Sequence, residues 1–255
     1  LEVSFIRMYP LFSPFPSRGT GGAVFWPCLL ALVTFANTAS GNKTLNREND
    51  AWALIASADG ASFQAPHIPG GCRASITASG FELVQERDGG RVLAEWFTVH
   101  GHGRDGNISA PWTGGEPIPG DRSVWFQGER MAVHYEHSPQ GLRQNFTVFM
   151  RPPGEGELSI SLDLEGDHRA TLEGTDGLRF SDHEGNTTFD YRDLRCWDAA
   201  QKPLKAHMEL VDADHGQRLS LFVDDADALY PITIVLTVII GLRSIQERAP
   251  MDGGL

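Results

Sequence analysis

Apolar and polar residues alternate with a period of two along much of this 255-residue chain, and this pattern restricts the fold more than any other feature. From residue 158 to residue 165, leucine or isoleucine stands at every even position and serine, aspartate or glutamate at every odd one. Successive side chains of a β-strand point to opposite faces, so this segment predicts a strand buried on one face and solvated on the other. Similar runs occur at residues 81–84, 92–99, 123–127, 131–135, 146–150, 187–191, 206–211 and 218–223.

Turn-forming sequences rich in glycine, proline and aspartate separate these runs, for example at residues 88–90, 139–141 and 152–154. Strands that recur about every 8–14 residues, with no helix of useful length between them, indicate an all-β, antiparallel β-sandwich over residues 73–234. A parallel sheet would need helical crossovers, and the sequence offers none. We expect the sandwich to consist of two packed subdomains that meet near residue 120.

The charge of the chain is acidic and unevenly distributed. There are 33 acidic and 21 basic residues, which give a net charge of −12, and residues 151–230 hold ten of the excess negative charges. A nucleic-acid surface needs clustered lysine and arginine to neutralise phosphates, so the acid excess excludes this class of partner. The composition also excludes a coiled coil, a collagen and a wholly disordered chain.

An apolar run, residues 23–36, lies in a segment without charge between Arg18 and Lys43. A basic flank, an apolar stretch of about 7–15 residues and small residues after it are typical of a signal peptide, whereas a spanning helix needs about 20 apolar residues. We therefore expect residues 1–39 to form a helical export signal and residues 40–72 a linker, with the protein secreted or held at a bacterial cell surface. A retained anchor that contacts the membrane through residues 23–36, and a buried core helix, are the alternatives.

Two cysteines remain after removal of such a leader, Cys72 and Cys196. In an oxidising compartment they are candidates for a disulfide across the domain, provided that their Cα atoms come within about 7 Å of each other. Two unrelated, half-buried thiols are the alternative, and the spacing along the chain does not distinguish the two cases.

Two loop-like motifs have the spacing of ligand-binding sequences. Residues 101–106 match the glycine pattern of a dinucleotide-binding loop, but residues 107–115 cannot form the helix that would hold the pyrophosphate, so we interpret the motif as a loop. Asp212 and Asp214 begin a sequence like a calcium loop, but Val223 stands where the bidentate glutamate belongs, which favours a solvated turn.

Two histidine pairs have ligand-like spacing. His100 and His102 would share one face of a strand, whereas His134 and His137 would not. A zinc site needs three or four ligands in one place, and neither pair has an evident third ligand. We therefore predict no metal and no other cofactor.

Pairs of acidic residues offer the best enzymatic alternative, because glycoside hydrolysis uses two carboxyl groups. Candidate pairs are Glu129 with Glu136 and Asp163 with Glu165, but any acidic chain contains such pairs, and they identify no catalytic residue. Four tryptophans could stack on a sugar ring, although aromatic residues in strands more often fill the core. They are Trp96, Trp112, Trp125 and Trp197.

The order of motifs between Trp125 and Ile234 resembles a region of a known protein family. The motifs are QGLRQNFTV at Gln140–Val148, PPGEGELSI at Pro152–Ile160, GTDGLRF at Gly174–Phe180 and LYPITI at Leu229–Ile234. This order is similar to the N-terminal β-sandwich region of large secreted bacterial proteins that carry FG-GAP (integrin-α-like) or SBBP β-propeller repeats downstream. The resemblance implies a non-catalytic cap or presentation module, with no family active site to transfer.

The chain departs from this family after Ile234, where the uncharged sequence Val235–Leu242 replaces the Asp-Pro and the repeats. We expect residues 235–255 to be an atypical tail, produced by an early end of the reading frame before the repeats. A membrane tail and an ordinary last strand are the alternatives.

The sequence therefore predicts a non-catalytic structural or adhesion-type module of a repeat protein, secreted or on the cell surface, whose partner is a cell-surface protein or a polysaccharide. An exported carbohydrate-binding or glycoside-active domain is the first alternative. A membrane-anchored surface protein is the second.

Overall fold

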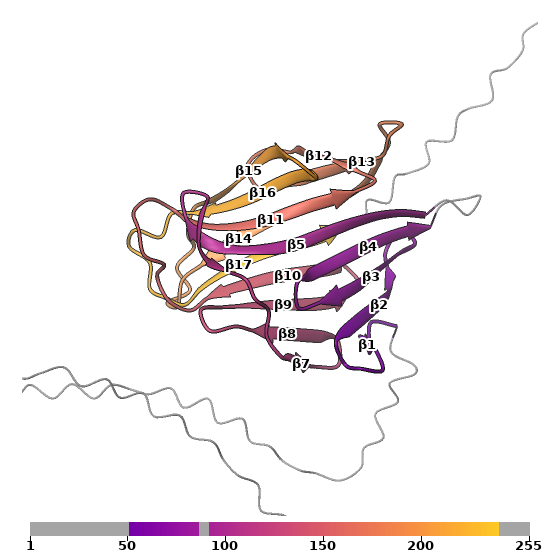
Figure 1. Cartoon of the computed structure of the whole chain (residues 1–255), viewed down its shortest axis with the longest axis horizontal. Helices are drawn as coiled ribbons and strands as arrows, with labels where there is room; N and C mark the ends of the chain where they lie inside the picture. The colour runs from indigo at the N-terminus through magenta and orange to yellow at the C-terminus, as the bar shows by residue number, and fades with distance from the viewer. Residues whose placement is uncertain (1–50, 87–91, 240–255) are drawn as a thin grey trace, which may run out of the picture. The chain divides into compact units, whose positions relative to one another are not determined.

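The computed structural model describes residues 51–86 and 92–239. Within them the chain forms strands, turns and loops and no helix, and the paired strands are antiparallel (Figure 1). The prediction of an all-β, antiparallel fold is confirmed. The expected helical leader, residues 1–39, lies outside the described residues.

The described strands form two sheets, which we call sheet A and sheet B. Sheet A has the strand order β1-β2-β3-β4-β5-β11-β16-β15, with β6 paired to β5. Its strands are β1 (Ile55–Ala56), β2 (Ser62–Ile68), β3 (Cys72–Thr77), β4 (Gly80–Glu86), β5 (Val92–Arg104), β6 (Asn107–Pro111), β11 (Leu158–Gly166), β15 (Ala206–Ala213) and β16 (Gly216–Val223).

Sheet B has the strand order β12-β13-β14-β17-β10-β9-β8-β7. Its strands are β7 (Pro117–Pro119), β8 (Ser123–Gln127), β9 (Met131–Ser138), β10 (Gly141–Val148), β12 (Arg169–Leu172), β13 (Leu178–Ser181), β14 (Thr187–Trp197) and β17 (Ile232–Ile239).

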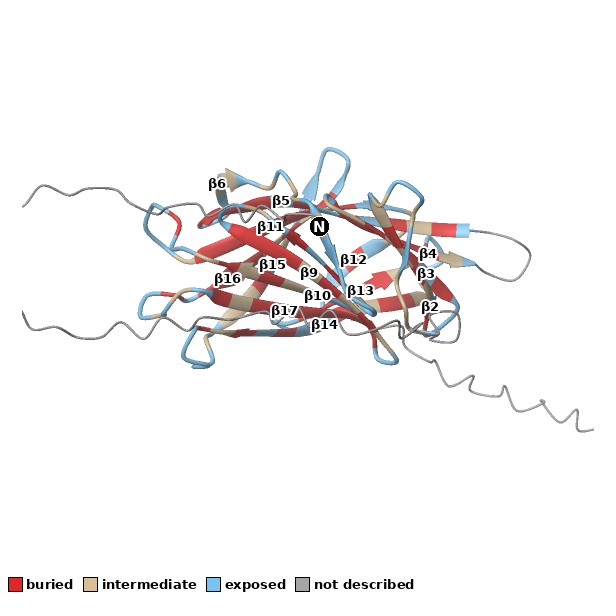
Figure 2. Ribbon diagram, turned by 90° about the horizontal axis from the view of Figure 1, so that it is seen from below, coloured by how far each residue is buried: buried red, intermediate tan, exposed pale blue. Residues whose placement is uncertain are grey.

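Sheet A and sheet B pack against each other through inward-facing apolar side chains, so the described residues form a β-sandwich. Buried residues, red in Figure 2, occur along strands of both sheets. Phe97 of β5 lies at the centre of this contact and is fully buried. Its ring stacks on Phe81 of the same sheet with centroids 4.4 Å apart. Across the sandwich it meets Phe180 and Tyr191 of sheet B at 5.4 and 5.3 Å.

A bulge in β5 reverses which side chains face the core. Val99 pairs with Leu162 of β11 and Gly101 pairs with Ser161, so His100 has no partner in that ladder. Buried positions are odd-numbered before the bulge, and the even-numbered His102 is buried after it. An extra residue in one strand has this effect because side chains alternate with a period of two.

A second irregularity has the same effect in β14. The register against β17 shifts between Arg192 and Arg195, where Asp193 has a φ of 64°. Cys196 consequently faces the core, while Arg195 and Trp197 face outward.

A buried ion pair joins β5 to the segment before β17. Arg104 Nη2 donates to Asp225 Oδ2 at 2.9 Å, and the two side chains are 5% and 1% exposed. Arg104 also donates to the backbone carbonyls of Pro152 and Gly156, and the Tyr230 hydroxyl donates to Asp225 at 2.6 Å. One buried cluster therefore holds three separate chain segments together.

The strands extend beyond the expected range of 73–234 at both ends. β1 and β2 lie within residues 40–72, which we had assigned to a linker. Residues 235–239, assigned to an atypical tail, form the second half of β17, which lies between β10 and β14. Leu236 and Val238 of this segment are fully buried, so residues up to 239 belong to the core.

The strands on either side of residue 120, β7 and β8, are hydrogen-bonded neighbours in sheet B. The described strands all fall within one compact unit. Residues 51–86 and 92–239 include no helix that is long and apolar enough to cross a membrane.

Candidate functional site

None of the five tryptophans in the described part of the chain is fully buried. Trp96 and Trp125 are 44% and 39% exposed, and Trp52, Trp112 and Trp197 are half-buried. Phenylalanine and tyrosine fill the core in their place. The expectation that strand tryptophans fill the core is therefore wrong for Trp96 and Trp125, whereas Trp112 is half-buried and packs against the core.

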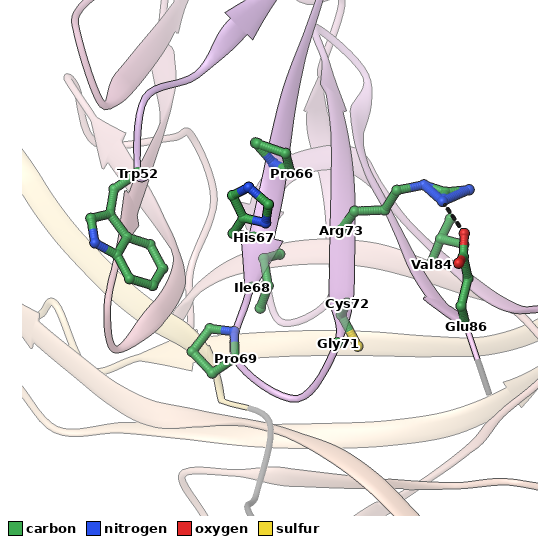
Figure 3. A pocket seen from close by; sticks show the side chains of 10 residues that line it. All are labelled: Trp52, Pro66, His67, Ile68, Pro69, Gly71, Cys72, Arg73, Val84 and Glu86. Atoms are coloured by element: carbon green, nitrogen blue, oxygen red, sulfur yellow. Dashed lines mark hydrogen bonds and ion pairs between the residues drawn. The ribbon is translucent and has the colours of Figure 1, made fainter. Parts of the chain in front are cut away.

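A groove of about 440 Å³ curves around the turn between β2 and β3 (Figure 3). Trp52, His67 and Pro69 lie on one side of it, and the ion pair between Arg73 and Glu86, at 2.8 Å, lies on the other. The groove thus combines an aromatic, proline-rich wall with a charged wall.

His137 connects this groove to sheet B. It is fully buried on β9, with Nδ1 2.9 Å from the carbonyl oxygen of Trp52 and Nε2 3.0 Å from that of His67. His134 lies on the opposite face of β9, as the sequence pattern predicts.

One row of outward side chains crosses six neighbouring strands of sheet B. In pairing order the row is Ile118, Trp125, His134, Asn145, Val235 and Arg195. Arg143, Asn145, Arg195 and Trp197 line a groove of about 320 Å³ across β10, β17 and β14. We call this row and groove the outer face of sheet B.

The side chains in the middle of this face, Trp125, His134 and Asn145, are uncharged and contact one another. The rings of Trp125 and His134 are 3.9 Å apart and nearly parallel, and Asn145 Nδ2 lies 3.0 Å from His134 Nδ1. Burial lowers the pKa of His134 to about 4, against the opposing effect of Glu136, and Arg143 adds to the lowering. His134 is therefore uncharged at neutral pH.

His100 and His102 do not share a face, contrary to the sequence prediction, because of the bulge in β5. His100 is exposed, with Nδ1 3.0 Å from Asp163 Oδ2. His102 points inward and lines a cavity of about 390 Å³ with Trp112 and Arg130. Burial, and secondarily Arg130, lower the pKa of His102, and its ring has no hydrogen-bond partner among the described residues.

The glycine-rich motif at residues 101–106 is the end of β5 and its turn into β6, and not an irregular loop. A Cβ atom at Gly103 would overlap the carbonyl oxygen of Asn107, because β6 approaches β5 so closely. Close strand packing explains this glycine without any nucleotide.

The carboxyl groups of Glu129 and Glu136 do not form a site. Glu129 lies in the turn before β9, and Glu136 faces outward near the far end of that strand, 3.4 Å from Arg143. Seven residues of extended chain correspond to roughly 23 Å, compared with the separation of about 5–10 Å that glycosidases use.

Asp163 and Glu165 do share a face of β11, and both line a hollow beside the turn between β15 and β16. Arg218 Nε donates to Asp163 at 2.8 Å. Burial would raise the pKa of Asp163, but the hydrogen bonds from Arg218 and His100 outweigh it and lower the pKa. The calcium-like sequence starting at Asp212 is a strand end and a tight hairpin turn.

Among the residues that the structure describes, the carboxyl group with a raised pKa is Glu95, and it lies inside the molecule. Burial raises its pKa, and the hydrogen bond with His168 opposes this effect. Glu95 is 1% exposed, with Oε2 3.2 Å from His168 Nδ1, and neither residue lines any hollow described above. This acid–base pair is therefore closed to a substrate.

The raised pKa of Glu95 predicts a pH dependence of stability. A group with a raised folded-state pKa stabilises the fold below its unfolded pKa of about 4.3, and this stabilisation is lost as the pH rises through the folded pKa. In Glu95→Gln this dependence should be absent, so the stability of the variant relative to the wild type should increase from pH 4 upward and then level off. Urea denaturation at a series of pH values measures the difference, and a difference that is constant with pH would contradict this assignment.

Cys72 and Cys196 are buried thiols on different sheets, and no disulfide joins them in this structure. Burial raises the pKa of Cys196 to about 12, with Asp225 and Asp198 as further causes. No group of three or more histidine, cysteine or acidic residues placed to hold a metal ion occurs in the part of the chain that the structure describes.

Sequence reasoning missed Arg195 and Asn145, which the outer face of sheet B brings together with Trp125 and Trp197. The alternation of apolar and polar residues in the sequence predicts that Asn145 faces outward, so this residue could have been identified from the sequence. Arg195 and Trp197 become outward only through the register shift in β14. No protein-family model, no curated protein and no solved structure matches this chain.

Proposed function

We propose that this protein is a non-catalytic, adhesion-type binding module that is secreted or displayed on the cell surface. The surface position of Trp96, Trp125 and Trp197 is the observation that carries the proposal. Burial of a tryptophan side chain removes more apolar area from water than burial of most other side chains. An exposed tryptophan is therefore unfavourable, and a partner that covers it stabilises the complex. Tryptophan is also among the residues that contribute most to binding interfaces.

The distribution of acidic groups supports binding over catalysis. A glycosidase needs a protonated carboxyl group at the substrate, and the carboxyl group with a raised pKa, Glu95, is enclosed in the core. The export-like run at residues 23–36 and the resemblance of residues 125–234 to secreted repeat proteins support a location outside the cytoplasm.

A glycoside-active domain is the second candidate, and the shared hollow of Asp163 and Glu165 favours it. In that case the chain would release new reducing ends from a polysaccharide. Asp163→Asn and Glu165→Gln would abolish the release.

To test the proposal, the full chain is attached to fluorescent beads, and the retention of the beads is measured on surfaces coated with extracellular polysaccharides or with extracellular proteins. A parallel assay detects the release of reducing ends. We expect retention on one class of surface, loss of retention after heat unfolding, and no reducing ends. Release of reducing ends that Glu165→Gln abolishes would overturn the proposal in favour of the enzyme. Retention no greater than that of heat-unfolded chain on every surface would overturn it as well.

A further inference from the structure

We propose that the outer face of sheet B binds an acidic polysaccharide, with the sugar chain lying across the strands from Trp125 to Trp197. This inference rests on the proposed binding function and names its face and its ligand class.

The face has the dimensions of an extended binding surface. Trp125 on β8 and Trp197 on β14 are separated by four strand spacings in the order β14-β17-β10-β9-β8. At about 4.8 Å per spacing the two rings are roughly 20 Å apart. Aromatic rings at both ends with polar side chains between them suit a chain of sugar rings, because each ring has an apolar face to stack and hydroxyl groups at its rim.

An arginine without an ion-pair partner among the described residues favours an acidic ligand on this face. Arg143 and Arg195 line the groove at opposite sides, with Asp193 as the acidic residue that lines it. Arg143 contacts Glu136 at 3.4 Å, whereas Arg195 has no hydrogen bond or ion pair with any described residue. A guanidinium group binds a carboxylate through two parallel hydrogen bonds, so Arg195 is placed to bind the carboxylate of an acidic sugar.

One residue that lines the groove carries a buried polar atom without a partner. Asn145 lines the groove and donates its Nδ2 hydrogen toward His134, and its Oδ1 is buried and has no partner in the part of the chain that is described. Buried polar atoms are normally hydrogen-bonded. Because Oδ1 has less than 1 Å² of accessible surface, a sugar hydroxyl would supply the missing donor only after the Asn145 amide turns toward the groove.

The outer face of sheet A makes a natural comparison. Trp96 is exposed there, but its direct neighbours across the strands are Glu82 and Glu165. Two carboxylates beside this ring would repel an acidic polysaccharide, so Trp96→Ala is a matched control for Trp197→Ala.

The test is native electrophoresis of the full chain in gels that contain polygalacturonate, the neutral glucan pullulan, or no polysaccharide. We expect polygalacturonate to retard the wild type, and we expect Arg195→Gln and Trp197→Ala to weaken binding by about fivefold or more, which corresponds to about 1 kcal/mol. Trp96→Ala should bind like the wild type, and added salt should weaken binding because the interaction is electrostatic. Circular dichroism and the urea midpoint of each variant verify that it is folded.

Several outcomes would overturn the inference. Equal retardation by pullulan, or equal loss of binding in Trp96→Ala, would do so while leaving a polysaccharide-binding function intact. Absence of retardation in every gel, together with bead retention on a protein-coated surface, would overturn this inference and leave the binding function in place.

Discussion

Asp225→Ala is expected to lower the free energy of unfolding by about 3–5 kcal/mol, because it leaves the buried guanidinium of Arg104 without its counter-charge. The variant also removes the acceptor of the Tyr230 hydroxyl. Since this cluster joins β5, the Pro152 loop and the segment before β17, its loss should act on the whole sandwich. Urea denaturation followed by circular dichroism measures the change in unfolding free energy.

The matched control is Arg73→Ala, which breaks an ion pair whose side chains are 48% and 66% exposed. A surface pair of this kind contributes about 0–1 kcal/mol. If Asp225→Ala destabilises the protein no more than Arg73→Ala does, the cluster is not a buried ion pair and the account of its role is incorrect.

The same variant should change the acid sensitivity of the protein. Burial would raise the pKa of Asp225, but the hydrogen bonds from Arg104 and Tyr230 outweigh it and lower the pKa. A lowered pKa gives stabilisation that is present above the unfolded value of about 3.9 and is lost as the pH falls through the folded value. The difference between wild type and Asp225→Ala should therefore shrink below about pH 4.

Phe97→Ala is expected to destabilise the protein by about 3–5 kcal/mol through loss of buried area and formation of a cavity. The ring is fully buried and contacts aromatic side chains of both sheets, including Phe81 and Tyr191. The sandwich cannot close around the missing ring without moving one sheet against the other. A guanidinium or urea titration of the variant, with the slope of the transition compared with that of the wild type, measures the loss.

Trp96→Ala is the control for Phe97→Ala, because the neighbouring residue points to the solvent side of the same strand. Its expected effect is below about 1 kcal/mol. Equal effects of the two substitutions would show that the strand does not separate a core face from a solvent face at this position, which would contradict the register of β5.

Alternation predicted the all-β fold because one face of most strands is buried and the other solvated. In β11, for example, Leu158, Ile160, Leu162 and Leu164 are all buried, as the pattern indicates. The opposite face is solvated only in part, because Glu165 is exposed whereas Ser159 and Ser161 are buried. The same rule placed His134 and His137 on opposite faces of β9, where the structure has them. Long, regular strands thus carry enough information in a single sequence to orient their side chains.

The alternation of apolar and polar residues predicted the wrong side-chain orientation where a strand contains an extra residue or an unrecognised bend. The bulge at His100 separates His100 from His102, and the shift near Asp193 turns Trp197 to the outside. Neither is visible in the sequence, because a bulge changes the register without changing the composition of the strand. The strand β2 was missed for a related reason, since its register against β3 shifts after Ala65 and interrupts the alternation.

The candidate binding face could not be predicted from the sequence, because register shifts are not visible there. It combines the consecutive strands β8, β9 and β10 with β14 and β17, which come much later in the chain, and it depends on which way β14 faces after its register shift. Sequence reasoning supplied the tryptophans as candidates but could not place any two of them on the same surface. The contrast between the arginines beside Trp197 and the glutamates beside Trp96 arises only from strand pairing.

The most direct test of binding through the outer face of sheet B is hydroxyl-radical footprinting of the full chain, read by mass spectrometry, with and without polygalacturonate. We expect the ligand to protect Trp125 and Trp197 from oxidation while the exposed Trp96 stays as reactive as in the free protein. Protection of Trp96 with unchanged reactivity of Trp125 and Trp197 would contradict this expectation.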